Sequence, residues 1–225
     1  SAFREGQKEA VEHDLGDLTL HGVEWDENPE RVALDLVELF GDRPVWLEIG
    51  FGGAEHMLWQ AAQNSDVHII GAEPFLNGVA KAVRGAAQDG LTNLTLQHGD
   101  VRDVLATLPD ASLSRAFILF PDPWPKSRHN KRRLLRTKFI AELHRVLKPG
   151  AELRFASDIN HYVDWTLTRM HRHGGWDWTA ESHADWTVRP DDWPGTRYEA
   201  KAIREGRVPQ YFKFIKLDPA QKASS

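Results

Sequence analysis

The stretch VWLEIGFGGAEHMLWQAAQN, residues 45–64, decides the fold class of this chain. It begins with a compact apolar run typical of a buried strand, turns at the glycines of EIGFGG, and continues with apolar residues at helical spacing. A strand, a glycine-rich turn and a helix make the first half of a βαβ unit. The stretch therefore predicts a parallel sheet with helices packed on it.

The same alternation of strand and helix continues through most of the chain. Helices are expected at residues 30–41, 54–64, 77–90, 101–109, 134–150 and 159–175, and strands at 45–50, 67–73, 94–100, 115–122, 151–157 and 211–217. Such an order gives right-handed crossovers and a doubly wound, mostly parallel α/β sheet. Residues 176–210 are rich in Trp, Pro and charge and are expected to be irregular, and the final strand is expected to be antiparallel.

Length and composition favour a single domain with polar ends. With 225 residues and 41% hydrophobic content, the chain can bury one substantial core. We expect a flexible N-terminal arm at residues 1–27, one domain at 28–217 and a tail at 218–225. The sequence contains no apolar run near the roughly 20 residues that span a bilayer, and no signal-like start. These features predict a cytoplasmic protein without a membrane partner.

The cysteine and histidine content argues against a metal site. There are no cysteines, so disulfides and Cys-ligated zinc are excluded. Of the 11 histidines, the only close pair is His171 and His173, and no third ligand stands near them. Because tetrahedral zinc needs three or four convergent ligands, no metal is predicted.

Acidic residues stand at or near the ends of the first four predicted strands, at Glu48, Glu73, Asp100 and Asp122. Ligands of doubly wound sheets bind beyond the carboxyl ends of the strands. Glu73 has the position of a carboxylate that accepts hydrogen bonds from ribose hydroxyls, and Asp100 that of an acceptor for an adenine amino group. Four carboxylates repel a pyrophosphate and favour a cationic, phosphate-free cofactor, which S-adenosylmethionine is.

The glycine turn EIGFGG is compatible with more than one cofactor. Gly50 and Gly52 allow the backbone to turn sharply and to approach a ligand closely. The dinucleotide fingerprint G-x-G-x-x-G is not satisfied, because its sixth place holds Glu55. The missing fingerprint makes an NAD-dependent oxidoreductase less favoured than a methyltransferase, but it stays open as an alternative.

A dense basic run follows Asp122, although the whole chain has a net charge of -5. Between Pro123 and Ala141 stand seven Lys or Arg and no acid. Such a concentration attracts a polyanion to one face of the protein. The alternative is an ordinary solvated helix face.

The motifs EIGFGG, GAEP, GD, FPDPWPKSRHNKRR, ASD and TRYE occur in one order and spacing. On these motifs the chain resembles the bacterial tRNA (guanine-N7)-methyltransferase family over about residues 45–217, and the proline-rich basic motif together with TRYE is the specific part. The resemblance implies a Rossmann-like class I methyltransferase fold with a seven-stranded sheet and an antiparallel last strand. It also implies S-adenosylmethionine as cofactor, tRNA as partner, and methylation at N7 of a guanosine in the variable loop, conventionally position 46.

The same resemblance implies roles for individual residues. The cofactor site is expected to contain Glu48, Gly50, Gly52, Glu73, Asp100 and Asp122, and Asp122 is also the expected catalytic residue. Substrate is expected to contact Lys126, Asp158, Thr196, Arg197, Tyr198 and Glu199. RNA phosphates are expected to contact Arg128, Lys131, Arg132 and Arg133. The glycine usual at the end of the first motif is Ala54 here.

Several of these residues have structural alternatives. A carboxylate can accept both N1–H and N2–H of guanine, which favours Asp158 and Glu199 as readers of the base. The less favoured alternatives are that Asp158 caps a helix that starts near Asn160, and that Glu199 pairs with Arg197 or Lys201 in solvent. Trp124 either stacks on the base or anchors its loop.

Three further functions compete with the favoured one. They are methylation of another position or substrate by the same fold, the oxidoreductase already mentioned, and an RNA-binding module without catalysis. The sequence leaves the choice between a monomer and a homodimer open.

Overall fold

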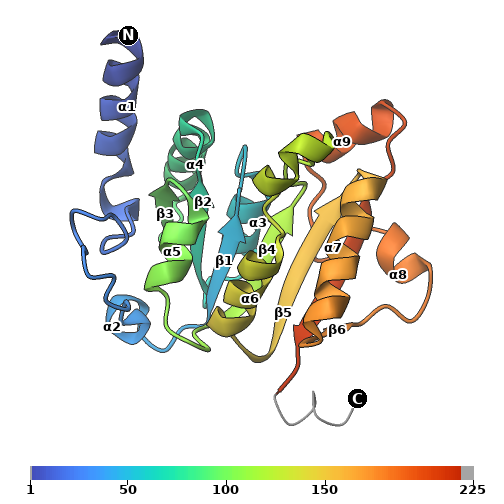
Figure 1. The fold of residues 1–225 in the computed structure, drawn as a ribbon. Coiled ribbons are helices and arrows are strands. Elements are labelled where there is room, and N and C mark those ends of the chain that lie inside the picture. The colour runs from blue at the N-terminus through green and yellow to red at the C-terminus, as the bar shows by residue number, and fades with distance from the viewer. Residues whose placement is uncertain (1, 219–225) are drawn as a thin grey trace. The chain divides into compact units, whose positions relative to one another are not determined.

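The computed structural model describes residues 2–218, which form two compact units that meet in sequence between Pro109 and Asp110. The strands make a seven-stranded sheet in the order β3-β2-β1-β4-β5-β7-β6 (Figure 1). The last strand, β7 (Gln210–Lys216), pairs antiparallel with its neighbours β5 and β6. The α/β class, the number of strands and the antiparallel last strand predicted from the sequence are confirmed.

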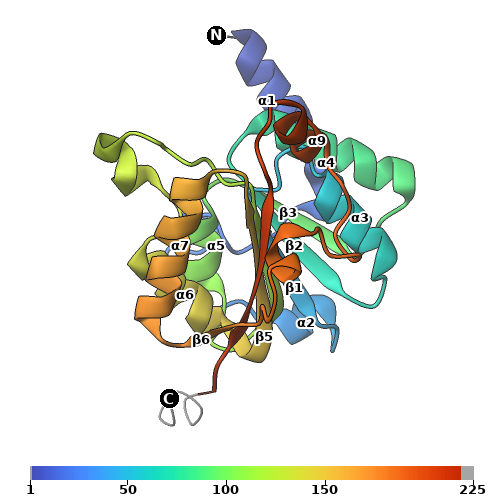
Figure 2. The ribbon, with the colours of Figure 1, turned by 90° about the vertical axis from the view of Figure 1, so that its right-hand side faces the viewer.

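The first unit contains three parallel strands: β1 (Val45–Ile49), β2 (His68–Glu73) and β3 (Leu94–His98). All residues of β1 and β2 are buried, as expected of central parallel strands. Three helices cover them: α3 (Glu55–Gln63), α4 (Leu76–Asp89) and α5 (Val101–Thr107). Figure 2 shows α3 and α4 on one face of these strands and α5 on the other.

The start of the chain is more regular than predicted. Helix α1 (Ala2–Leu15) and the 3-10 helix η1 (Gly16–Leu18) occupy a segment for which no element was expected. Leu15, Leu20 and Val23 are buried, and the Leu20 amide donates to the Leu96 carbonyl of β3 over 3.0 Å. These apolar anchors tie the segment after α1 to the edge of the sheet.

The helix predicted at residues 30–41 is mostly wrong. Only α2 (Leu36–Phe40) forms, and its first turn is capped by the Asp35 side chain, which accepts from the Glu38 amide over 3.1 Å. Residue Arg31 has a left-handed backbone, with φ 54°, which interrupts any helix before the cap.

The second unit contains β4 (Leu113–Leu119), β5 (Leu147–Ser157), β6 (Trp176–Trp178) and β7. Its helices are η2 (Ser127–Arg132), α6 (Thr137–Val146), α7 (Asn160–His173), α8 (Ala184–Thr187) and α9 (Arg197–Arg204). In Figure 2, α6 and α7 cover one face of these strands and α8 lies on the other. The core centres on fully buried Phe117, Phe155 and Phe212.

Two boundaries in this unit were predicted wrongly. The helix expected at 134–150 ends at Val146, because Leu147 already pairs with Leu113 as the first residue of β5. The segment 176–210, expected to be irregular, contains β6, α8 and α9. Strand β6 forms only because β7, distant in sequence, offers it an edge.

The predicted tail lies outside the described residues, apart from residue 218. Within residues 2–218, no helix is long and apolar enough to cross a membrane.

Candidate functional site

Glu48 is a buried carboxylate near the end of β1. It is 3% exposed, and its Oε1 is hydrogen-bonded to Nδ1 of His56 from α3, which is 4% exposed. The other ring nitrogen of His56 lies 3.3 Å from Nε2 of Gln60, one turn further along α3. This buried chain of polar groups fixes the direction of the Glu48 carboxylate.

The glycine turn, residues 50–53, lies directly after β1. Gly50 and Gly52 have φ of 66° and 54°, which favours glycine at both positions. The Gly52 amide donates to Oε2 of Glu73 over 3.1 Å, so the carboxylate at the end of β2 holds the turn in place. A methyl group added at Gly50 or Gly52 would meet no atom within 4 Å, so the space beside the turn is open.

Glu73 lies among groups that shift its protonation. Burial raises the pKa of Glu73 above its ordinary value, and the nearby Glu48 carboxylate acts in the same direction. The hydrogen bond from the Gly52 amide opposes both effects on this pKa. The structure therefore brings together Glu48, the glycine turn and Glu73, as the sequence predicted.

The Asp100 carboxylate already has hydrogen-bond partners within the protein. It caps α5 by accepting from the Arg102 amide over 2.9 Å, and the Arg102 side chain binds the same carboxylate, with Nη2 2.6 Å from Oδ2. The hydrogen bond from Arg102 holds the pKa of Asp100 below its ordinary value. This end of the sheet is therefore less negative than the count of acids implied.

Asp122 lies on the loop that follows β4, residues 120–126, called the Asp122 loop below. The residue is exposed, and its Oδ1 accepts a hydrogen bond from the Trp124 amide over 3.1 Å. Phe120 and Trp124 both have positive φ, 52° and 42°, so the loop keeps an unusual course. A loop held this way presents its carboxylate in one direction.

Trp124 packs against η2, which follows its loop. The Arg132 guanidinium lies 4.9 Å from the Trp124 ring centroid, and the His129 ring meets it edge-on at 5.6 Å. Of the two roles open to Trp124, these contacts favour the anchor of the loop.

The basic segment, residues 126–133, contains η2 and divides into exposed and buried cations. Lys126, Arg128, Lys131 and Arg132 are exposed. Arg133 is only 7% exposed, and its Nε donates to the Pro123 carbonyl over 2.9 Å. The Arg133 guanidinium also lies 4.6 Å from the centroid of Trp165 on α7. Arg133 therefore braces the Asp122 loop, a placement at odds with the phosphate contact predicted for it.

Asp158 follows β5 and is nearly buried, at 6% exposed. Nε of Arg207 donates to its Oδ2 over 2.7 Å, and the Tyr198 hydroxyl donates to Oδ1 over 3.2 Å. The alternative that Asp158 caps α7 is wrong, because the residue at the N-cap of that helix is Ile159, without a side-chain hydrogen bond.

Glu199 is buried at 3% exposed, on the first turn of α9. Its Oε1 accepts from the Tyr211 hydroxyl and, over 3.2 Å, from Nη1 of Arg189. Its amide donates to Oγ1 of Thr196, the N-cap of the helix, over 3.2 Å. The alternative of a solvent pair with Arg197 or Lys201 does not fit this burial, because the Glu199 carboxylate lies in the buried network with Tyr211 and Arg189.

Sequence reasoning missed the partners His56, Arg189, Arg207 and Tyr211. One signal was available for Arg207. Because β7 runs antiparallel to β5, with Ser157 opposite Gln210, a residue just before β7 must lie beside a residue just after β5. Among residues 2–218, no group of three or more His, Asp or Glu is arranged to hold a metal ion.

Comparison with protein families places the chain among methyltransferases. The sequence model of a family described as putative methyltransferase matches residues 42–210. A tRNA (guanine-N(7)-)-methyltransferase of Jannaschia sp. strain CCS1 is 48% identical over 214 residues, which is 95% of this chain and 90% of that protein. One of Cereibacter sphaeroides is 50% identical over 212 residues, 94% and 86% of the two chains.

Solved structures with low sequence identity share the fold. The 16S rRNA methyltransferase KamB superposes with a TM-score of 0.58 at 17% identity, covering 80% of this chain and 92% of that one. A 16S rRNA (adenine(1408)-N(1))-methyltransferase variant from Catenulisporales acidiphilia, with cosubstrate SAM, has a TM-score of 0.53 at 19% identity and covers 84% and 94%. These likenesses confirm the predicted Rossmann-like class I methyltransferase fold.

Proposed function

This chain belongs to the tRNA (guanine-N7)-methyltransferase family, and from that membership we propose that it transfers a methyl group from S-adenosylmethionine to N7 of a guanosine in tRNA. The finer proposal is that the guanosine lies in the variable loop, at position 46. The observation that carries the proposal is an identity of 48% that extends over 95% of this chain and 90% of the relative. Family membership leaves the oxidoreductase alternative without support.

The first unit offers groups that suit the cofactor. S-adenosylmethionine supplies an electrophilic methyl group on a sulfonium, and it has no phosphate. Glu48 and Glu73 give buried carboxylates beside a turn whose glycines leave open space. Such carboxylates attract a cation and accept hydrogen bonds from hydroxyl and amino groups. We propose that Glu48, Gly50, Gly52, Glu73 and Asp100 hold the cofactor, with Arg102 limiting the negative charge at Asp100.

The reaction needs positioning more than proton transfer. Guanine N7 carries an unprotonated lone pair, so no general base has to act before attack. Correct placement of the reacting atoms can contribute roughly 7–11 kcal/mol. Asp122 is the carboxylate proposed to stabilise the positive charge that spreads over the base.

Asp158 and Glu199 are proposed to select guanine by accepting from N1–H and N2–H. Both are already hydrogen-bonded to tyrosine hydroxyls and arginines. For Asp158 to accept from the base, the Tyr198 hydroxyl must release it. Tyr198 is 44% exposed and its ring packs at 5.0 Å from that of Phe120, so it has room to turn outward. Thr196 and Arg197 are proposed to contact the same nucleoside.

The exposed cations of the basic segment are proposed to hold tRNA phosphates. Lys126 is nearest in sequence to Asp122, and Arg128, Lys131 and Arg132 extend the surface. Since its substrate is tRNA, the protein is proposed to act in the cytoplasm, as a monomer or a homodimer.

The decisive experiment incubates the protein with S-adenosylmethionine and tRNA that lacks the modification, followed by nucleoside analysis. We expect N7-methylguanosine to be the product. Reduction and aniline cleavage then map the modified position, and a tRNA with adenosine at that position serves as the control. Methylation of any other atom, or of the adenosine control, would overturn the proposal.

A further inference from the structure

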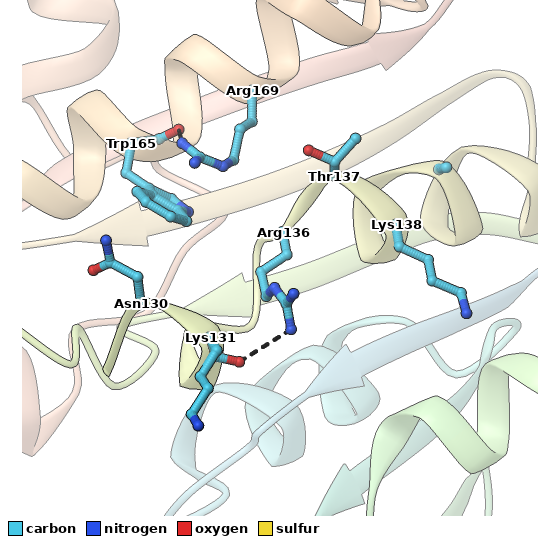
Figure 3. Close-up of a pocket in the computed structure, with 8 residues that line it drawn as sticks. Asn130, Lys131, Arg136, Thr137, Lys138, Trp165 and Arg169 are labelled. Carbon is cyan, nitrogen blue, oxygen red and sulfur yellow. Dashed lines mark hydrogen bonds between the residues drawn. The ribbon is translucent and has the colours of Figure 1, made fainter. Parts of the chain in front are cut away.

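A groove of about 590 Å³ lies on the surface made by η2, α6 and α7. Four cations line it: Lys131, Arg136, Lys138 and Arg169. Figure 3 shows Arg136 directed toward Lys131, Lys138 at the start of α6, and Arg169 beside Trp165. The described residues that line this groove include no acid. Arg136 and Lys138 belong to the basic run between Pro123 and Ala141, but of the four cations only Lys131 was individually predicted to contact RNA phosphates.

Two of these cations are held in place by neutral partners. Nη1 of Arg136 donates to the Lys131 carbonyl over 3.1 Å, the bond drawn in Figure 3. The Arg169 guanidinium lies 3.0 Å from the centroid of the Trp165 ring, and its Nη1 donates to the Trp165 carbonyl over 3.2 Å. Trp165 is itself fixed, because its Nε1 donates to the Leu135 carbonyl over 3.0 Å. The charges are thus oriented in advance of any ligand.

The positive charge in the groove has no counterion among the residues that the structure describes. Among residues 2–218, none of the four cations forms a salt bridge. Partial burial lowers the pKa of Arg169, and repulsion from the nearby Arg172 and Arg133 adds to this effect. Arginine still stays protonated at neutral pH. A bound anion would relieve this repulsion.

We propose that the α6–α7 groove, defined by Lys131, Arg136, Lys138 and Arg169, binds backbone phosphates of the tRNA substrate. Several cations spread along a groove suit a polyanion better than a single small anion. Planar guanidinium groups such as those of Arg136 and Arg169 can hold phosphate oxygens in pairs. The Trp165 ring is already covered by a guanidinium, so the groove binds backbone and not a stacked base.

The groove continues the basic segment. Lys131 belongs to both, and Arg133 connects Trp165 with the Pro123 carbonyl of the Asp122 loop. RNA held in the groove would therefore lie along the same strip of the second unit that leads to Asp122. This inference rests on the proposed function for the identity of the RNA, but not for the chemistry of the groove.

The test compares Arg136→Gln, Lys138→Gln and Arg169→Gln with the unchanged protein. Each variant should raise the KM for tRNA about tenfold at low salt. Each should also reduce the slope of log affinity against log salt by about one. Because the groove touches backbone outside the modified nucleoside, kcat at saturating tRNA and the Kd for S-adenosylmethionine should stay unchanged. Lys138 is exposed, and its side chain makes no hydrogen bond to any residue in the described range 2–218, so this variant tests the inference even if Arg169→Gln folds poorly.

Arg84→Gln on α4 and Lys148→Gln on β5 are matched controls, since both residues are exposed cations outside the groove. An unchanged KM and salt slope in the groove variants, or an equal change in these controls, would overturn the inference. Failure of the proposed function is recognised separately, because the unchanged protein would then bind RNA without forming N7-methylguanosine.

Discussion

Arg207 donates a hydrogen bond from its Nε to Oδ2 of Asp158 over 2.7 Å, joining the loop before β7 to the residue that follows β5. The bond to Asp158 is the main reason that the pKa of Arg207 lies above its ordinary value, with Glu205 adding to it. A nearly buried carboxylate needs such a partner, because an unpaired charge at this depth is costly. Arg207 therefore fixes the position of the carboxylate that is proposed to read guanine.

Replacing Asp158 by alanine should lower kcat/KM for tRNA by about tenfold or more, since a hydrogen bond to a charged group contributes about 1.5–3 kcal/mol. The Kd for S-adenosylmethionine, measured by calorimetry, should stay close to that of the unchanged protein. Asp164→Ala on α7 is the matched control, because Asp164 is exposed. A parallel loss of cofactor affinity in Asp158→Ala would contradict a role in reading the base.

Glu73→Gln should change how stability depends on pH. Burial raises the pKa of Glu73 above 4.5, so the folded state keeps a proton that the unfolded state has already lost. The contribution of Glu73 to the free energy of unfolding should therefore decrease as pH rises from about 4.5 to the folded-state pKa, so the difference between the unchanged protein and Glu73→Gln should change over this range. Glu73→Gln lacks this decrease, as urea unfolding between pH 4 and 7 can establish.

The control for Glu73 is Glu30→Gln, a change at an exposed carboxylate. Its free energy of unfolding should follow that of the unchanged protein across the pH range. If the difference in the free energy of unfolding between Glu73→Gln and the unchanged protein is independent of pH, the pKa of Glu73 is not raised by folding.

Arg133→Gln should destabilise the fold by about 1–3 kcal/mol, because the Pro123 carbonyl loses its donor in a part-buried place. Urea unfolding measures this change. The salt slope of tRNA binding should stay the same, since a buried guanidinium makes no phosphate contact. Exposed Arg132→Gln should do the opposite, with little effect on stability and a smaller slope. Equal changes in stability and in salt slope for the two variants would refute the assignment of Arg133 to loop support and of Arg132 to phosphate contact.

Thr196→Ala should cost about 1 kcal/mol of stability, because Oγ1 of Thr196 caps α9 by accepting from the Glu199 amide. Thr196→Ser keeps the hydroxyl and should restore most of the loss. A serine variant as unstable as the alanine variant would show that the methyl group, and not the cap, is what matters.

The order of strands and helices was predictable because the spacing of apolar residues and the turn residues at the ends mark most elements locally. The five buried residues of β1 and the left-handed Gly90 that ends α4 are local signals of this kind. Helix α1 was missed because it has no sustained apolar stripe, and residues such as Ala, Glu and Lys support helix through propensity alone.

The residues of the site were easier to predict than their partners. Glu73 stands at a strand end by sequence alone, whereas Arg207 reaches Asp158 across 49 residues and needs the pairing of β5 with β7. The burial of Arg133 depends on Trp165 and on a carbonyl ten residues earlier, which no local pattern encodes. Charge counts therefore found the cationic region but not which cations face solvent.

Ala54, the N-cap of α3, has φ of 69° and is fully buried. An L-residue in this left-handed conformation costs about 1–2 kcal/mol, which glycine avoids. Ala54→Gly should therefore raise the melting temperature by roughly 2–4 °C per kcal/mol recovered. The methyl group of Ala54 thus limits the thermal stability of this enzyme, and its removal is a simple route to a more thermostable variant.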